Sequence, residues 1–252
     1  MNKLCLSIFL IFIVTVDSQN LSELYKEVNA SVVVINIISI EPRKINDALN
    51  LLTKATQGSG VLISEDGLIW TAAHVVQSAE LVQVEFLDGE VYEATVLSSN
   101  PLADVALIKI KGEFNLKNKK VVKIGNSDMQ NIGDDIFVIG APFGIKQSLS
   151  KGIISGKHSP EALNNSFINV EFIQTDAAIN HGNSGGPMFN MKGEVIGITS
   201  RIFSESGSFN GLAFAISSNT AKKILMEEPN VWSGMNFVMM TGVIAKALNI
   251  PQ

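Results

Sequence analysis

Alternation of apolar and polar residues predicts a chain built mainly of short β-strands. In residues 81–86, Val82, Val84 and Phe86 face one side of an extended chain and the polar residues between them face the other. The Asp-Gly pair at residues 88–89 then predicts a turn. Runs rich in valine and isoleucine predict further strands at residues 31–40, 121–124, 136–139, 168–173 and 195–199. Many short strands at this spacing are typical of β-barrels or a β-sandwich.

Helices are predicted in only two places along this pattern. Residues 21–28 form one, and residues 219–228 form the other, with its apolar side chains on one face. Residues 41–57 interrupt the first group of strands and are expected to form a surface loop. The Lys-Gly pair at residues 192–193 is expected to be the tip of a hairpin.

The clearest chemical signal is the sequence GNSGG at residues 182–186. Glycines near Ser184 leave its hydroxyl uncovered and let the backbone turn sharply, so that two N–H groups can point at one position. Acyl transfer requires this combination of a nucleophile and a pair of donors for the developing oxyanion. The alternative is a glycine-serine loop with no chemical role, and the residues that could act with Ser184 decide between the two.

Two residues upstream could serve as a base and its partner. His74 follows the apolar run 67–73 and is expected to lie at the end of a buried strand. Asp104 lies between a turn and the apolar run 105–110, where a carboxylate is costly unless something pairs with it. Taken alone, each has a plainer interpretation, as a packed core histidine and a solvated turn aspartate. An imidazole N–H would pair with Asp104 and be held in the useful tautomer. The chain order His, Asp, Ser is that of chymotrypsin.

Six segments together resemble the HtrA/Deg family of trypsin-like serine proteases, in family order from about residue 28 to residue 228. They are GSGVLI at 58–63, TAAHVV at 71–76, ADVALIK at 103–109, IGAPFG at 139–144, TDAAIN at 175–180 and GLAFAI at 211–216.

The resemblance implies an all-β fold, the chymotrypsin/trypsin-like double β-barrel with short helices, and a site in the cleft between the two barrels. It implies that Ser184 is the nucleophile, His74 the general base and Asp104 the residue that orients it. The backbone N–H groups of Gly182 and Ser184 would form the oxyanion hole. The implied activity is that of an ATP-independent serine endopeptidase that degrades unfolded or misfolded exported proteins.

A pocket for the substrate residue before the scissile bond is also expected. Its walls would carry no charge, which disfavours cleavage after lysine or arginine and favours small or medium aliphatic residues, in line with the family. The residues expected to line it are Ala178, Ile179, Leu212, Ala213 and Phe214.

Composition and charge narrow the function classes. The chain has 252 residues, of which 46% are hydrophobic and 17% charged, so it can bury a sizeable core. The net charge is −5, and the basic cluster at residues 117–120 is expected to be a solvated loop and not a nucleic-acid-binding surface. His158, in a polar stretch, is expected to be exposed and without a role. The sequence contains no cluster of metal ligands and no phosphate-binding loop, so no metal or other cofactor is expected.

The first eighteen residues have the form of a secretory signal peptide. A lysine precedes the apolar run 4–16, and cleavage is expected before Gln19. An uncleaved membrane anchor is the alternative, although the run is shorter than the roughly 20 residues that span a bilayer. The single cysteine, Cys5, would leave with the signal peptide, so the mature chain would contain no thiol. The secreted digestive relatives of the family are stapled by disulfides, so together with the resemblance this absence implies a bacterial member of the family, exported to the periplasm.

The expected domain organisation is a protease domain at residues 19–228 and the truncated start of a PDZ domain at residues 231–252. A complete PDZ domain would need roughly 60 further residues, because so short a piece cannot bury a core. A homotrimer is the family's usual minimum assembly, and Tyr25 lies in the segment that could mediate it. One alternative function stays open, a non-proteolytic chaperone or binding protein for unfolded chains, if truncation leaves the site inactive.

Overall fold

The computed structural model describes most of the chain between residues 20 and 227. The described ranges are 20–45, 48–77, 79–141, 147–158, 170–180, 182–202 and 211–227, without the side chains of residues 40–52 and 201–202. The predicted signal peptide, the PDZ-like segment 231–252 and His181 lie outside these ranges.

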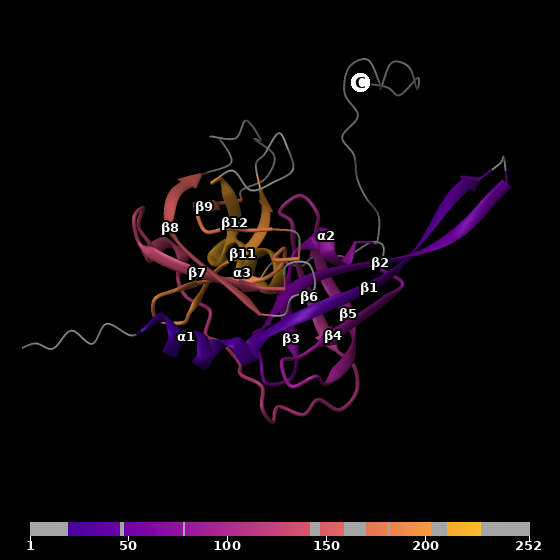
Figure 1. Cartoon of the computed structure of the whole chain (residues 1–252), viewed down its shortest axis with the longest axis horizontal. Helices are drawn as coiled ribbons and strands as arrows, with labels where there is room; N and C mark the ends of the chain where they lie inside the picture. Colours follow the sequence, from indigo (N-terminus) through magenta and orange to yellow (C-terminus); the bar gives the residue numbers. More distant parts are fainter. Residues whose placement is uncertain are drawn as a thin grey trace, which may run out of the picture.

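Within the described ranges, the strands form two closed antiparallel barrels of six strands each (Figure 1). The first barrel has the order β1-β2-β3-β6-β5-β4 and contains β1 (Val32–Ile45), β2 (Ala48–Leu62), β3 (Leu68–Thr71), β4 (Leu81–Glu85), β5 (Val91–Asn100) and β6 (Val105–Ile110). The second has the order β10-β11-β12-β9-β8-β7 and contains β7 (Asp135–Gly140), β8 (Ser148–His158), β9 (Phe172–Thr175), β10 (Pro187–Asn190), β11 (Val195–Ile202) and β12 (Ala213–Ser217). The prediction of an all-β double barrel is confirmed.

The helical segments in the described ranges are short. They are α1 (Leu21–Val28) with the 3₁₀ turn Asn29–Ser31, α2 (Ala73–Val76), the 3₁₀ turn Ser127–Met129, and α3 (Ser218–Lys222), which continues as a π-helical turn over Lys223–Glu227. The helix predicted at residues 21–28 is confirmed, and it begins where the Asn20 side chain accepts a hydrogen bond from the Ser22 N–H at 3.0 Å. Among the described residues, no helix has the length and apolar character needed to cross a membrane.

The sequence interpretation was wrong about residues 41–57. Apart from residues 46 and 47, which lie outside the described ranges, they form no surface loop, because β1 and β2 continue as an antiparallel ladder from the pair Val32–Val61 to the pair Ile45–Ala48. Figure 1 shows this two-stranded ribbon projecting away from the first barrel. Hydrogen bonds between the two backbones hold such a ribbon together. Near its base, Gln57 donates across the ladder to Asn36 at 3.0 Å.

The prediction of a strand at residues 121–124 was also wrong. In the described structure it is reduced to one bridge between Ile124 and Val195. The segment passes from one barrel to the other and bonds to both: the Val122 N–H donates to the Leu62 carbonyl at 3.2 Å, and the Val195 N–H donates to the Lys123 carbonyl at 2.9 Å.

The basic cluster at residues 117–120 is not simply solvated, because the Lys119 side chain is 0% exposed. Its ammonium donates to Asp88 at 3.0 Å and to Glu90 at 2.6 Å. It also lies over three aromatic rings, at 5.0 Å from the centroid of Phe86 and slightly farther from those of Tyr92 and Phe114. Burial lowers the pKa of Lys119, but the bonds to the two carboxylates raise it above its ordinary value. Through these contacts, Lys119 binds the segment between the barrels to the first barrel.

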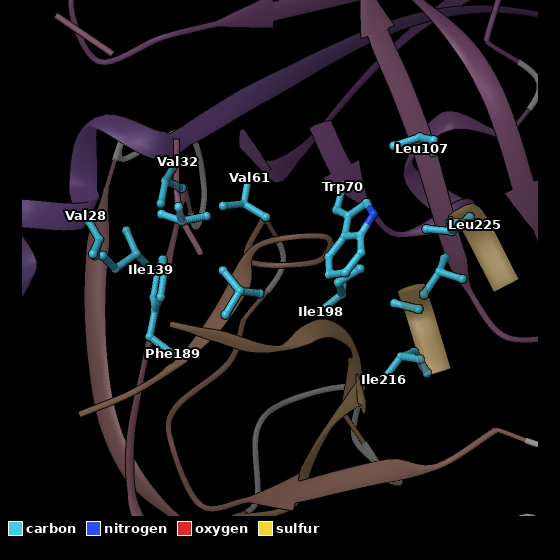
Figure 2. Close-up of a cluster of buried hydrophobic side chains, with 14 of the residues drawn as sticks. Val28, Val32, Val61, Trp70, Leu107, Ile139, Phe189, Ile198, Ile216 and Leu225 are labelled. Atoms are coloured by element: carbon cyan, nitrogen blue, oxygen red, sulfur yellow. The ribbon is translucent and has the colours of Figure 1, made fainter. Parts of the chain in front are cut away.

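Three apolar clusters form the interior. One fills the first barrel and one the second, and the third contains residues from both barrels, from α1 and from the C-terminal helical turns. Figure 2 shows this third cluster, the interbarrel core, in which Val61, Trp70 and Leu107 of the first barrel face Phe189, Ile198 and Ile216 of the second. Phe137 and Phe189 stack there with ring centroids 5.0 Å apart.

Phe189→Ala is expected to destabilise the protein by about 3–5 kcal/mol, because it removes a fully buried ring and leaves a cavity between the barrels. Urea unfolding followed by tryptophan fluorescence measures the change. Met129→Ala is the control, since that side chain is 72% exposed, and it should change the free energy of unfolding by less than about 0.5 kcal/mol. Equal effects of the two substitutions would contradict the assigned interbarrel core.

Candidate functional site

His74 lies on the one-turn helix α2 and not, as the sequence suggested, at the end of a strand. Strand β3 ends at Thr71, and the chain then turns. The turn places Val75 and Val76 in the core of the first barrel, while the His74 side chain remains 46% exposed. The helical turn thus buries the neighbours of His74 and leaves its imidazole partly exposed.

Asp104 lies in the turn before β6, as expected, with its residue 5% exposed. Its backbone has a φ of 56°, in the left-handed region that aspartate tolerates better than most residues. Asn100 stabilises the turn, because its side-chain oxygen accepts hydrogen bonds from the N–H groups of Leu102 and Ala103 at 3.1 and 3.0 Å.

The carboxylate of Asp104 is paired with His74. Nδ1 of His74 lies 2.9 Å from each carboxylate oxygen, and the His74 backbone N–H donates to Oδ1 at 3.0 Å. The Ser200 hydroxyl, from β11 of the second barrel, donates to Oδ2. Burial raises the pKa of Asp104, but the hydrogen bonds from His74 and Ser200 and the charge of His74 lower it below its ordinary value. The carboxylate is therefore ionised at neutral pH.

The Ser184 loop of the second barrel packs directly against the residues that flank His74. A side chain on Gly185, whose φ is +82°, would come within 2.2 Å of the Thr71 hydroxyl and 2.8 Å of the Ala72 nitrogen. Only glycine allows this approach. The Ser184 carbonyl accepts a hydrogen bond from the Ser59 N–H of β2 at 2.9 Å. The loop carrying the serine is thus held beside α2.

The Ser184 hydroxyl is half-buried and donates to the Ser200 carbonyl at 3.3 Å. Between the described side chains of Ser184 and His74 there is no hydrogen bond. Ser200 therefore connects the site from both sides, since its carbonyl contacts Ser184 and its hydroxyl contacts Asp104.

Backbone N–H groups in the loop alternate between bonded and free. The N–H of Asn183 donates to the Asn180 carbonyl at 3.0 Å, and that of Gly185 donates to the Thr199 carbonyl at 2.7 Å. The N–H groups of Gly182 and Ser184 have no acceptor among the described residues. These are the two groups expected to form the oxyanion hole.

The structure places the five expected pocket residues in different environments. Ile179 and Ala213 belong to the core of the second barrel, and Phe214 is half-buried. Ala178 and Leu212 are exposed. Their role as pocket walls stays a prediction.

His158 is half-buried, and the expectation that it would be exposed was wrong. Strand β8 continues to residue 158, which places the His158 ring against Phe214 and its Nε2 2.8 Å from the Gln174 side-chain oxygen. In the part of the chain that the structure describes, no three His, Cys, Asp or Glu side chains are grouped to hold a metal ion.

Sequence reasoning missed Ser200 and Ser59, which both connect the two barrels at the site. Ser200 directly follows a predicted strand and carries no local signal, because a single serine after an apolar run is common. Ser59 lies between two glycines in the segment 58–60, which indicated close backbone packing but not which loop it contacts.

Known proteins share this fold and these segments. A family model described as a trypsin-like peptidase domain matches residues 58–198. A probable periplasmic serine endoprotease DegP-like of Pseudomonas putida (strain GB-1) is 47% identical over 164 residues, which are 65% of this chain and 33% of the relative. A protein of the same description from Chlamydia muridarum (strain MoPn / Nigg) is 43% identical over 171 residues, 68% of this chain and 33% of the relative. The chain thus matches about a third of the length of these curated relatives.

Two solved structures of the HtrA-type protease AlgW are similar over most of the chain. The structure with a tripeptide has a TM-score of 0.68 and 32% identity, and the match covers 82% of this chain and 64% of that one. The structure with a decapeptide has a TM-score of 0.69 and 29% identity, with 92% and 76% covered. By family match, fold and relatives, the chain belongs to the HtrA/Deg family of trypsin-like serine endopeptidases.

Proposed function

We propose that this chain cleaves proteins with His74, Asp104 and Ser184 as a catalytic triad. One observation carries the proposal: Nδ1 of His74 pairs with both oxygens of the buried Asp104 carboxylate at 2.9 Å, beside the loop of the other barrel that carries Ser184. A histidine so paired keeps its proton on Nδ1, which leaves Nε2 free to act as a base.

In the proposed mechanism, the Ser184 hydroxyl attacks the scissile carbonyl while Nε2 of His74 accepts its proton. The imidazolium that forms is stabilised by Asp104, and it then gives the proton to the leaving amine. Water, activated by the same imidazole, releases the acyl group from Ser184. No step requires a nucleotide, which is consistent with an ATP-independent activity.

The negative charge that develops on the carbonyl oxygen would be bound by the N–H groups of Gly182 and Ser184. Both lack an acceptor among the described residues, while the N–H groups of Asn183 and Gly185 are bonded within the protein. Donors held ready for the transition state contribute a large part of the rate enhancement in acyl transfer.

One observation favours the alternative of a non-proteolytic chaperone. The Ser184 hydroxyl is directed to the Ser200 carbonyl and not to His74. A contact with His74 therefore requires the Ser184 hydroxyl to leave the Ser200 carbonyl, and side-chain rotation of this kind is fast for a partly exposed residue. We favour the protease, because the His74–Asp104 pair is complete without this rotation.

The names of the relatives describe periplasmic serine endoproteases. We propose the same compartment for this chain, with unfolded or misfolded exported proteins as substrates and uncharged pocket walls formed by Ala178, Ile179, Leu212, Ala213 and Phe214. The homotrimer and the domain boundaries stay predictions. Tyr25, which lies in the segment that could mediate a trimer, donates its hydroxyl proton to the Gln147 carbonyl within this chain at 2.9 Å.

Ser184→Ala is expected to abolish hydrolysis of unfolded casein, because it removes the nucleophile and leaves the loop backbone intact. Peptide release and suppression of casein aggregation are measured together for the parent and the variant. If neither protein cleaves casein while both suppress its aggregation, the chaperone alternative replaces the protease.

Cleavage is expected mostly after small or medium aliphatic residues, since a pocket without a carboxylate would leave a lysine or arginine side chain buried and unpaired. Mass spectrometry of the casein fragments identifies the residue before each cut, with the Ser184→Ala digest as background. A majority of cuts after lysine or arginine would contradict the proposed pocket.

Asp104→Asn is expected to lower kcat by about 10⁴-fold, because an amide favours the wrong imidazole tautomer. It should also change how stability depends on pH. The pKa of Asp104 is lower in the folded protein than its ordinary value of 3.8, so its contribution to stability is complete above that value and is lost as the pH falls through the folded-state pKa.

Urea unfolding of the parent and of Asp104→Asn between about pH 2 and pH 6 measures this contribution. The difference in unfolding free energy should shrink as the pH falls below about 4. A difference that stays constant over this range would show that Asp104 contributes no linked proton.

A further inference from the structure

Ser59 is fully buried in β2, at the boundary between the two barrels. Both backbone polar groups of Ser59, the N–H and the carbonyl, form hydrogen bonds there. The N–H donates to the Ser184 carbonyl at 2.9 Å, and the carbonyl accepts from the Thr71 hydroxyl at 2.7 Å. The backbone of the first barrel thus holds one end of the Ser184 loop.

The hydroxyl of Ser59 bonds to two further segments of the second barrel. It donates to the Gly182 carbonyl at 2.6 Å and accepts from the Ala141 N–H at 3.0 Å. A serine hydroxyl has one proton to donate, and here that proton goes to the residue that carries one of the proposed oxyanion donors. Ser59 therefore contacts both residues of the proposed oxyanion hole.

Ser59 has little room to move. A Cβ on Gly58 would lie 2.6 and 2.7 Å from the two γ-carbons of Val75 and 3.2 Å from the Ser184 carbonyl oxygen. A Cβ on Gly60 would lie 2.8 Å from Cδ1 of Ile35. Close packing on both sides fixes the backbone from which the Ser59 hydroxyl projects.

Among the described residues, only Ser59 donates a hydrogen bond to the Gly182 carbonyl. Asn183 is 3% exposed, and its amide oxygen has no partner among the described residues. The hydroxyl of Thr199 holds the carbonyls of Asn183 and Gly186, which lie farther along the loop. Gly182, with a φ of 102°, has the conformational freedom of glycine and needs an external contact to fix it.

We propose that Ser59 is a positioning residue that holds the Gly182 and Ser184 backbone in the orientation required for oxyanion binding. This inference rests on the proposed protease function. Without the hydroxyl, the Gly182 carbonyl and the Ala141 N–H lose their partner, and the loop populates orientations in which the two free N–H groups no longer point at one site.

Ser59→Ala is expected to lower kcat for an aliphatic peptide substrate by about 10- to 100-fold, with KM little changed, because a displaced donor fails in the transition state more than in substrate binding. The low-field NMR signal of the His74–Asp104 proton should remain, since Ser59 contacts neither residue. Ser218→Ala is the matched control: it also removes a fully buried hydroxyl bonded to a backbone carbonyl, that of Gly125 at 2.7 Å, and it should keep the parent kcat.

A second pair of variants separates the hydroxyl from folding. Ser59→Thr and Ser59→Val add side chains of the same shape, and only the first keeps the donor. The Thr variant should be at least about tenfold more active than the Val variant at equal thermal stability. Equal activity of this pair, or a parent-like kcat in Ser59→Ala, would overturn the proposal. Loss of the low-field signal in Ser59→Ala would also overturn it. If Ser184→Ala itself retains full activity, the proposed protease function fails instead.

Discussion

His74 and Asp104 lie on one barrel and Ser184 on the other, so the interbarrel core sets the distance between the proposed base and nucleophile. Trp70 precedes the turn that carries His74, and Phe189 follows the loop that carries Ser184; both are fully buried in that core. Protein interiors are close-packed and resist small displacements. Apolar packing therefore supplies the rigidity that the polar site requires, although none of these apolar side chains is proposed to take part in the chemistry.

Polar contacts then define the orientation that packing alone leaves free. Ser59 of the first barrel bonds to Gly182 and Ser184 of the second, and Ser200 of the second barrel bonds to Asp104 of the first. Each barrel thus donates a serine hydroxyl to a group on the other barrel. Buried and satisfied hydrogen bonds of this kind specify one arrangement, because a shifted barrel would leave their groups unpaired.

Much of this arrangement could be predicted from the sequence, and the failures have physical reasons. Alternation identified β4, and continuous apolar runs indicated strands such as β6 and β7, whose residues are buried almost throughout. The sequence pattern did not predict β5 and β8. The sequence pattern also failed for residues 41–57, which extend the β1–β2 ladder, and for Lys119, which packs against three rings, two of them far upstream in the chain. The segments around His74, Asp104 and Ser184 indicated the proposed site, but Ser59 and Ser200 owe their contacts to tertiary packing, which a linear pattern does not contain.

The proposed site is organised more firmly around its base, His74, than around its nucleophile, Ser184. Asp104 accepts hydrogen bonds from the His74 ring, the His74 backbone and Ser200, and a left-handed backbone directs its carboxylate toward them. Three donors offset the cost of burying the charge, so the imidazole is oriented before any substrate arrives. Ser184 has one bond of 3.3 Å to a neutral carbonyl, which is weak and easily exchanged. The Ser184 hydroxyl therefore exchanges its partner more easily than the His74 imidazole does.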